Sequence, residues 1–289
     1  MTASALRYPA PAKLNLFLHV VGRRADGYHL LQTVFRFIDY GDELAFRVRD
    51  DAVIRRTTQL EDVPEDRDLC VRAARLLQDH TGCRLGADIE LVKRLPLGGG
   101  LGGGSSDAAT TLIALNRLWN TGVPREELQG LGLKLGADVP VFIFGRNAFA
   151  EGVGERLQEL VLGPAWYLVL VPEAAVSTAE IFSAAELTRN TNAITIAAFS
   201  AGPGHASGYV FSGRNDLEPV VVRRYPQVAK TLEWLRRYGD ARMTGSGACV
   251  FCNFGSEAQA ARVLSELPEG MRGFVARGLD RHPLWTGDE

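Results

Sequence analysis

The chain has 289 residues, of which 46% are hydrophobic and 23% charged, and its 32 basic and 34 acidic side chains leave a formal net charge of −2. This composition is typical of a soluble globular protein, and the length predicts roughly two domains. There is no basic tract for nucleic acid, no apolar run near the ~20 residues of a membrane span, and too few cysteines for a disulfide scaffold, so we expect a cytoplasmic protein that binds neither nucleic acid nor membrane.

Apolar patterns predict alternating strands and helices along the first half of the chain. Residues 11–21 alternate as in a strand, a turn at Asp26 and Gly27 follows, and an apolar run resumes over 28–40. We then expect a helix over 68–79, a strand over 87–92, a glycine loop, a helix with Ser105 and Ser106 as N-caps, and a helix from Pro124 to about Gly136. The apolar run 139–144 has the length of a strand.

The second half shows the same mixture. Strands are expected over 167–171, 248–254 and 273–276, and helices over 225–238 and 256–264. Residues 200–213 are rich in Gly, Ser and Pro and indicate an exposed loop. The connector near residues 161–164 is the best domain boundary, which divides the chain into residues 1–162 and 163–289.

The sequence GGGLGGG at residues 98–104 is the most unusual segment. A flexible linker would explain its composition, but this segment joins an expected strand directly to an expected helix. In that position successive backbone N–H groups can face one anion, with the partial positive charge of the helix N-terminus behind them. The pattern therefore favours a phosphate-binding loop, in which we expect Gly100 and Gly103 to tolerate no β-carbon.

Common nucleotide-binding templates do not fit this loop. A Walker A motif needs a lysine after its last glycine, and here Gly104 follows Gly103. The dinucleotide pattern G-x-G-x-x-G is met formally, but six glycines satisfy almost any spacing, and no acidic strand end follows about 20 residues later. The HRD and DFG companions of a protein-kinase loop are absent from the sequence. A nicotinamide-dependent oxidoreductase stays open as an alternative from another class.

Four segments together resemble the GHMP kinases, ATP-dependent kinases of small molecules with a Pro-led, Ser-ended glycine loop. They are PAKLNLFLHVVGRRADGYHLLQT, RLPLGGGLGGGSSDAA, LGADVPVFIFGRNAFAEGVGE and RMTGSGACVF, in the family's order over residues 11–251. Within the family they are most similar to members that transfer the γ-phosphoryl group of ATP to the 2-hydroxyl of cytidine-diphosphate-linked methylerythritol. Those members act in non-mevalonate isoprenoid precursor biosynthesis.

The resemblance implies a two-domain α/β fold, with a left-handed βαβ crossover in the N-terminal domain and a ferredoxin-like C-terminal domain. It implies ATP with Mg²⁺ as co-substrate and a small cytidine-diphosphate-linked acceptor. The expected assembly is a monomer or homodimer, between which the sequence does not choose. The resemblance also places the family's catalytic lysine and aspartate on Lys13 and Asp138. A lysine can neutralise charge on the transferred group, and a carboxylate can accept the proton of the attacking hydroxyl.

The remaining site residues are likewise implied by the resemblance. The ATP-binding set comprises Pro96, Leu97, Gly98, Gly99, Gly100, Leu101, Gly102, Gly103, Gly104, Ser105 and Ser106. Within it, Ser106 is the hydroxyl expected nearest to Mg²⁺. The substrate-binding set comprises Asn15, Tyr28, His29, Thr178 and Phe182. The rings of Tyr28 and Phe182 are expected to pack against the cytidine, and His29 to reach a polar edge of the base.

Each of these residues also has an ordinary structural explanation. Lys13 could be an edge-strand lysine, Asp138 a turn or cap residue, and Phe182 plain core packing. A GHMP kinase for another alcohol, such as homoserine, is the first alternative function, but it would have little use for Tyr28, His29 and Phe182. A catalytically inactive binding homologue would not need both Lys13 and Asp138.

Other polar features carry weaker expectations. Cys249 and Cys252 are expected to pack in a strand, and no spacing of cysteines or histidines indicates a structural metal. Asp68 falls near the expected adenosine pocket, but its role there is in doubt because a carboxylate offers only acceptors. A second glycine turn, over residues 244–247, is placed over the site by the resemblance.

Overall fold

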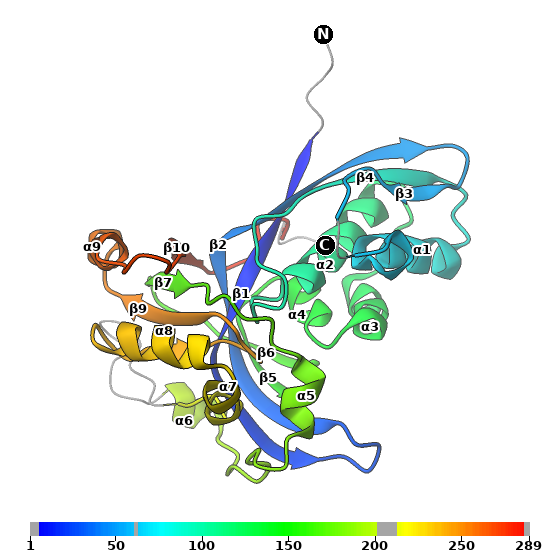
Figure 1. Cartoon of the computed structure of the whole chain (residues 1–289). Helices are drawn as coiled ribbons and strands as arrows, with labels where there is room; N and C mark the ends of the chain where they lie inside the picture. Colours follow the sequence, from blue (N-terminus) through cyan, green and yellow to red (C-terminus); the bar gives the residue numbers. More distant parts are fainter. Residues whose placement is uncertain (1–5, 61–62, 201–212, 286–289) are drawn as a thin grey trace.

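The structure is a computed structural model that describes residues 6–60, 63–200 and 213–285, and two long antiparallel strands run through its centre (Figure 1). β1 (Arg7–Arg23) pairs with β2 (His29–Arg49), and the hairpin closes through the expected turn, where Gly27 has φ 92°. The register shifts between Asn15 and Leu18. Such a bulge re-aims side chains, and here it directly follows two of the predicted site residues.

Four helices pack against the sheet in the N-terminal half. They are α1 (Leu69–Thr81), α2 (Gly103–Leu118), α3 (Arg125–Leu135) and α4 (Val139–Phe144). The accompanying strands are β3 (Ile54–Arg56), β4 (Gly86–Val92), β5 (Ala148–Gly152) and β6 (Arg156–Glu159). β4 and β5 pair antiparallel with β2, and β3 runs parallel to β4, so β3, α1 and β4 form a βαβ unit. The left-handed sense of a crossover stays a prediction.

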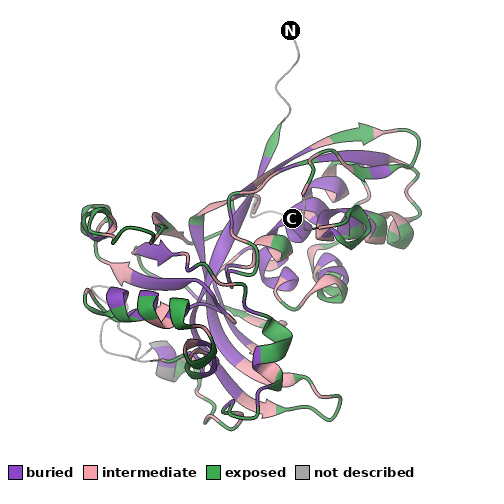
Figure 2. Cartoon of the chain, in the orientation of Figure 1, coloured by how far each residue is buried: buried purple, intermediate pink, exposed green. Residues whose placement is uncertain are grey.

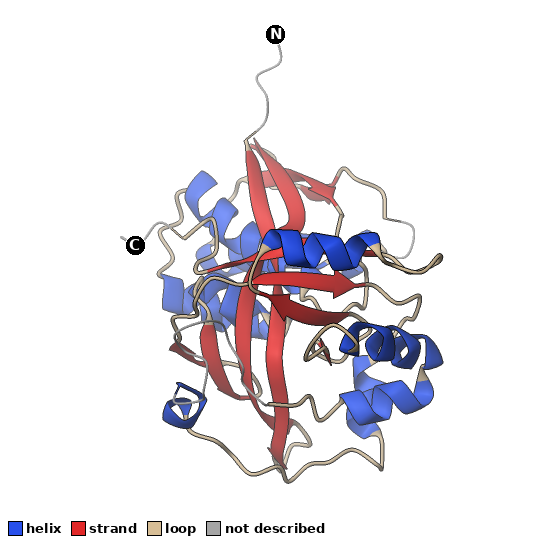
Figure 3. Ribbon diagram, turned by 90° about the vertical axis from the view of Figure 1, so that its left-hand side faces the viewer, coloured by secondary structure: helices blue, strands red, loops and turns tan. Residues whose placement is uncertain are grey.

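The C-terminal half has the ferredoxin-like arrangement that the resemblance implies. Its strands are β7 (Trp166–Leu170), β8 (Arg242–Met243), β9 (Val250–Phe254) and β10 (Gly273–Leu279). They lie antiparallel in the order β10-β7-β9-β8, and α8 (Pro226–Arg236) and α9 (Glu257–Ser265) complete the β-α-β-β-α-β pattern. Shorter helices are α5 (Thr178–Ser183), α6 (Ile196–Ser200) and α7 (Glu218–Arg224). Because β10 also pairs with β2, one sheet continues through both halves (Figure 3).

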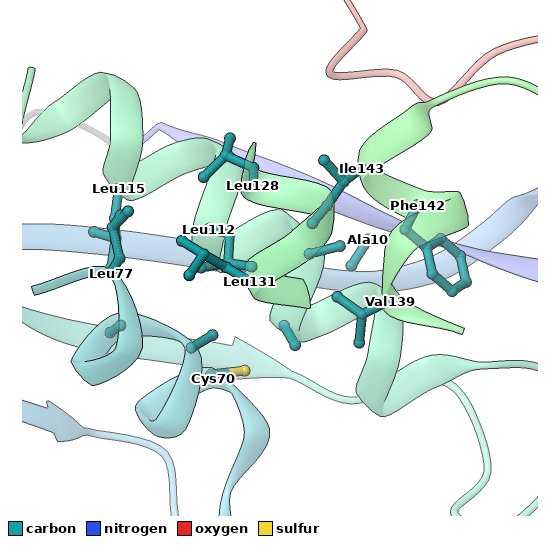
Figure 4. Packing of buried hydrophobic residues seen from close by; sticks show 14 of the residues in the cluster. Ala10, Cys70, Leu77, Leu112, Leu115, Leu128, Leu131, Val139, Phe142 and Ile143 are labelled. Atoms are coloured by element: carbon teal, nitrogen blue, oxygen red, sulfur yellow. The ribbon is translucent and has the colours of Figure 1, made fainter. Parts of the chain in front are cut away.

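Separate hydrophobic clusters stabilise the two halves. In the N-terminal half Leu77, Leu112 and Phe142 are completely buried between the helices and the sheet (Figure 4). In the C-terminal half α8 packs against the sheet through residues such as Leu232. A third cluster, which includes Phe17, joins β1 to β7 and β9 at the centre of the molecule, where Figure 2 shows buried residues along the long strands.

The connector between the halves is held by a buried arginine. The Nη1 of Arg36 donates to the carbonyl of Leu162 over 3.1 Å, and its Nη2 donates to the carbonyl of Gly163 over 3.0 Å. These are the residues on either side of the proposed boundary, so the boundary lies at a fixed point rather than in a loose linker. The division at 162/163 remains a proposal. Of the segment 200–213, residues 201–212 lie outside the described part of the chain.

One local expectation is wrong. Ser105 and Ser106 do not cap α2, because the helix begins earlier and Gly102, with φ 75°, occupies the N-cap position. The apolar run 139–144, which has the length of a strand, forms the helix α4. Its proline lies in the first turn, where no N–H is needed, and Gly145 ends it with φ 76°. Within the described residues, no helix combines the length and apolar character that a membrane crossing requires.

Candidate active site

One cleft brings the glycine loop together with β1 and the residue before α4. Its cavity of about 380 Å³ is lined by residues 96–105, by Lys13 and Asn15 of β1, and by Asp138. Thr178 and Phe182 of α5 line it from the C-terminal half. The fold therefore assembles in one place residues that the sequence separates by more than 160 positions.

The glycine loop is held by its carbonyl groups. The carbonyls of Gly98 and Gly99 accept hydrogen bonds from the N–H groups of Ala248 and Cys249, at 3.2 and 3.1 Å. The carbonyl of Leu101 accepts from the N–H of Lys13 at 3.0 Å. The second glycine turn thus supports the loop from the C-terminal half, and β1 supports it from the N-terminal half.

The loop leads into α2 in a way that suits an anion. Because α2 begins at Gly103, the N–H groups of its first residues have no partner within the helix, and the helix dipole adds positive potential there. Ser105 lines the cavity, whereas Ser106 is fully buried and its Oγ donates to the carbonyl of Pro11 over 2.7 Å. The expectation that Ser106 presents a hydroxyl to ATP and Mg²⁺ is therefore wrong, and Ser105 is the serine at the cleft.

Glycine is required to different degrees along the loop. A β-carbon on Gly100, which has φ 75°, would lie 2.2 Å from the carbonyl oxygen of Thr244. A β-carbon on Gly103 would meet its nearest neighbours, side-chain atoms of Leu95 and Lys93, at 3.3 Å. The protein itself thus excludes a side chain at Gly100, whereas at Gly103 the expectation depends on the approach of a phosphate.

Lys13 is buried among oxygen atoms at the centre of the cleft. Its Nζ lies 2.6 Å from Oδ1 of Asn15, 3.0 Å from the carbonyl of Gly100 and 3.2 Å from Oδ2 of Asp138. The Lys13 side chain is 3% exposed and that of Asp138 is 36% exposed. The Nδ2 of Asn15 in turn donates to Thr33 over 2.9 Å. The lysine is therefore fixed from three sides, and the carboxylate beside it faces the cleft.

The ordinary explanations of this pair do not hold. Lys13 lies in a strand but is not an exposed edge lysine, and Asp138 precedes α4 but its side chain makes no capping hydrogen bond. Although a proline usually disfavours a helical conformation of the residue before it, Val139 and Pro140 are both helical here. Asp138 is instead positioned by its place at the N-terminus of α4 and by its ion pair with Lys13.

A second cavity of about 520 Å³ adjoins the first and contains the predicted base-binding residues. Tyr28, His29 and Phe182 line it, and both cavities share Thr178 and Phe182. The rings of His29 and Phe182 lie 5.0 Å apart at 32°, and Tyr28 is 65% exposed. The tip of the β1–β2 hairpin and α5 thus form an aromatic pocket whose third ring, that of Tyr28, remains open to solvent.

The structure adds polar contacts around this pocket that the sequence analysis did not predict. The Nε of Arg189 donates to Nε2 of His29 over 3.0 Å, and no motif in the sequence singled out this arginine. The hydroxyls of Thr178 and Ser246 lie 2.6 Å apart, which joins α5 to the second glycine turn. Burial, and then the neighbouring guanidinium groups of Arg189 and Arg23, lower the pKa of His29.

A buried charged cluster of Lys93, Asp42 and Asp107 lies next to the glycine loop and the start of α2. Lys93 pairs with Asp42 and, over 2.8 Å, with Asp107 of α2. Burial and the nearby Asp42 raise the pKa of Asp107 to about 7, although Lys93 opposes this. Asp68 is not free for a nucleoside, because it caps α1 and pairs with Arg56 over 2.6 Å.

The cysteines behave as packing residues. Cys249, directly before β9, and Cys252, within it, are both buried, and burial raises the pKa of each thiol to about 12. In the described ranges no three His, Cys, Asp or Glu side chains are grouped as a metal ion would require.

The sequence matches known proteins along almost its whole length. Residues 68–146 match the GHMP kinases N terminal domain, and residues 206–273 match the GHMP kinases C terminal domain. A Thiobacillus denitrificans protein named 4-diphosphocytidyl-2-C-methyl-D-erythritol kinase is 63% identical over 278 residues, which is 96% of this chain and 97% of the relative. A protein of the same name from Nitrosospira multiformis is 61% identical over 96% of this chain and 93% of its own length.

Solved structures agree with these matches. A crystal structure of 4-(cytidine 5'-diphospho)-2C-methyl-D-erythritol kinase has a TM-score of 0.82 and 33% identity, and the match covers 94% of this chain and 99% of the other. Homoserine kinase from Cytophaga hutchinsonii has a TM-score of 0.70 and 16% identity over 98% of this chain and 96% of the other, which shows a common fold. The chain therefore belongs to the 4-diphosphocytidyl-2-C-methyl-D-erythritol kinase family, ATP-dependent small-molecule kinases with the GHMP fold.

Proposed function

We propose that this enzyme transfers the γ-phosphoryl group of ATP to the 2-hydroxyl of 4-diphosphocytidyl-2-C-methyl-D-erythritol and releases ADP. The observation that carries the proposal is the position of Lys13 and Asp138, 3.2 Å apart in the cavity that the glycine loop lines. That cavity adjoins the aromatic pocket, with which it shares Phe182. A phosphate donor on one side and a cytidine on the other would meet at this pair.

The roles of the pair follow from their surroundings. Asp138 is the carboxylate that lines the cavity beside Lys13, so it would accept or hold the proton of the attacking hydroxyl. The ammonium of Lys13 is fixed by Asn15 and Gly100, and it would stabilise charge on the transferred phosphoryl group without having to reorganise. Most of the catalysis is then positioning and electrostatic stabilisation, as is general for phosphoryl transfer.

The loop residues would hold the triphosphate. The N–H groups at the start of α2 supply donors, and the helix dipole favours the negative charge. Mg²⁺ would enter with ATP, and Ser105 and Asp138 are oxygen-bearing side chains at the cavity of the kind that Mg²⁺ accepts. When bound, the ion would neutralise phosphate charge. The cytoplasmic location, and the choice between monomer and homodimer, stay predictions.

A direct assay tests the proposal. ADP release would be measured with the cytidine-linked substrate and, in parallel, with homoserine and mevalonate, and phosphorus NMR would locate the new phosphate. We expect turnover with the cytidine-linked alcohol and phosphate on its 2-hydroxyl. Preferential turnover of homoserine or mevalonate would show that the enzyme is a GHMP kinase for another alcohol. Binding of NAD but not ATP would contradict any kinase function.

A further inference from the structure

Arg189 reaches the aromatic pocket through the ring of His29. Its Nε–H donates to Nε2 of His29 over 3.0 Å. A guanidinium group has only donors and stays protonated, so Nε2 must be the nitrogen without a proton. A neutral imidazole with an unprotonated Nε2 carries its proton on Nδ1. This one contact therefore fixes the tautomer of His29.

The guanidinium is itself fixed by backbone carbonyls. Its Nη1 donates to the carbonyl of Leu187 over 3.1 Å, and its Nη2 donates to those of Phe182 and Ala184 over 3.0 and 2.6 Å. Phe182 and Ala184 lie at the C-terminal end of α5, where a cation is favoured. Arg189 thus ties the imidazole of His29 to the segment that carries the Phe182 ring.

The surroundings keep this imidazole neutral. Burial lowers the pKa of His29, and the positive charges of Arg189 and Arg23 lower it further. Asp26 and Tyr28 are also titratable groups that line this pocket, but the causes that shift the pKa of His29 are its burial and the two arginines. A second proton on Nε2 would face Arg189, which has no acceptor to offer it. The structure gives Nδ1 no hydrogen-bond partner within the described residues, so Nδ1–H remains for a ligand.

We propose that Arg189 is a specificity-determining positioning residue, which holds His29 in the tautomer that offers the pyrimidine an N–H donor at Nδ1. This inference rests on the proposed function, in which the pocket takes a cytidine. The N3 and O2 atoms of cytosine accept hydrogen bonds, whereas N3 of uracil carries a proton. A fixed donor pairs with the cytosine edge and opposes the N3–H of uracil, and an opposed or unpaired polar group is costly where the bound base excludes water.

The first test needs no substitution. Nitrogen NMR of histidine-labelled enzyme distinguishes the two neutral tautomers, and we expect the His29 signals to show Nδ1 protonated and Nε2 unprotonated at pH 7.5. Assignment comes from the signal that is lost in His29→Ala. A His29 ring protonated on Nε2 in the wild-type enzyme would overturn the inference.

The second test measures discrimination with the nucleotides CDP and UDP. Calorimetry would give the Kd of each for the wild type and for Arg189→Met, which keeps an unbranched apolar stem, shorter than that of arginine, and removes its donors. We expect the preference for CDP to fall at least about tenfold, which is the scale of one net hydrogen bond. In turnover, KM for the cytidine substrate should rise while kcat and KM for ATP change little. An unchanged preference in a folded variant would contradict the inference.

Two controls separate this role from a merely structural one. Arg23→Met removes another positive charge near His29 but not the contact to Nε2, so it should keep the preference for CDP. In a His29→Ala background, Arg189→Met should have no further effect on the preference, because it acts through the missing ring. An additive loss would assign Arg189 a structural role. If the wild type binds neither nucleotide, the proposed function itself fails, whereas intact CDP binding with an insensitive preference removes only this inference.

Discussion

The two cavities of the cleft are built in opposite ways. The side proposed to bind phosphate, called the phosphate side, is formed by backbone: its glycines adopt left-handed conformations at Gly98, Gly100 and Gly102, and its carbonyls are held by neighbouring segments. The side proposed to bind the cytidine, called the nucleoside side, is made of side chains from the hairpin tip and α5, where Tyr28 is exposed and the His29 ring packs on that of Phe182. A rigid backbone suits the invariant triphosphate, and separate side chains suit recognition of one base.

This difference implies that the two sides can be damaged independently. A change in the loop should weaken ATP binding, and a change in the rings should weaken binding of the cytidine substrate. A change in the pair between them should slow the chemical step while both ligands still bind. Variants on each side can therefore test whether ATP binding, binding of the cytidine substrate and the chemical step depend on separate parts of the cleft.

The largest effect is expected at Asp138, where the two sides meet. Asp138→Asn keeps the shape of the side chain but removes the proton acceptor and the charge that faces Lys13 at 3.2 Å. A positioned general base contributes about 10²–10⁴ in rate, so kcat should fall by at least about 10². The Kd values of both substrates should change little, as for an interaction expressed in the transition state. Single-turnover kinetics and calorimetry provide these numbers.

Asp138→Ala is the companion variant. If the transition state is loose and positioning outweighs proton removal, Asp138→Asn keeps much of its activity and Asp138→Ala does not. Near-wild-type turnover in both variants would exclude Asp138 from the mechanism.

The next effect is expected at Gly100. Gly100→Ala adds left-handed strain of about 1–2 kcal/mol and a β-carbon 2.2 Å from the carbonyl of Thr244, so the loop must move. We expect ATP affinity, measured by calorimetry, to fall at least about tenfold, which corresponds to roughly 1.4 kcal/mol. Gly98→Ala is the matched control, because it has φ 66° but nothing within 4 Å of the added carbon. Equal losses in both variants would show that general strain, and not the loop's docking, sets ATP affinity.

Substitutions on the nucleoside side should have an effect of similar size, but on the other ligand. Tyr28→Ala and Phe182→Ala should each weaken binding of the cytidine substrate by about 1–3 kcal/mol, the contribution of one stacked base. ATP affinity should remain nearly unchanged. Circular dichroism would check that the variants fold, since Phe182 also packs on His29. A loss that falls on ATP instead would place the rings in the adenine pocket.

The smallest effect concerns stability on the phosphate side. The pKa of Asp107 is raised to about 7, so between pH 6 and 8 the folded protein binds more protons than the unfolded chain, whose carboxyl has lost its proton. Stability therefore falls as pH rises through this range, by about 1 kcal/mol for this group. Asp107→Asn should remove that slope in urea unfolding followed at pH 6, 7 and 8. An identical slope in the variant would mean that Asp107 is already ionised at pH 6.

The contrast between the two sides also explains what the sequence could predict. The glycine loop is local, so its strand-to-helix context was visible in one segment. The ferredoxin-like half followed from the resemblance and from strand and helix patterns at most of its elements. Ser106 was misplaced because the helix starts at Gly103, which turns the second serine inward.

The nucleoside side depends on contacts that no local pattern reports. Arg189 meets His29 only because the chain returns to the hairpin tip 160 positions later. Six apolar residues at 139–144 carry no period that distinguishes a short helix from a strand, and only the proline in the first turn of α4 and Gly145 indicate a helix.

One set of six dissociation constants tests the division of the cleft most directly. ATP and CDP would each be titrated into Gly100→Ala and into Phe182→Ala, beside the wild type. The structure predicts that Gly100→Ala loses affinity for ATP and keeps it for CDP, and that Phe182→Ala loses affinity for CDP and keeps it for ATP. Parallel losses of both ligands in either variant would contradict two separately built sides.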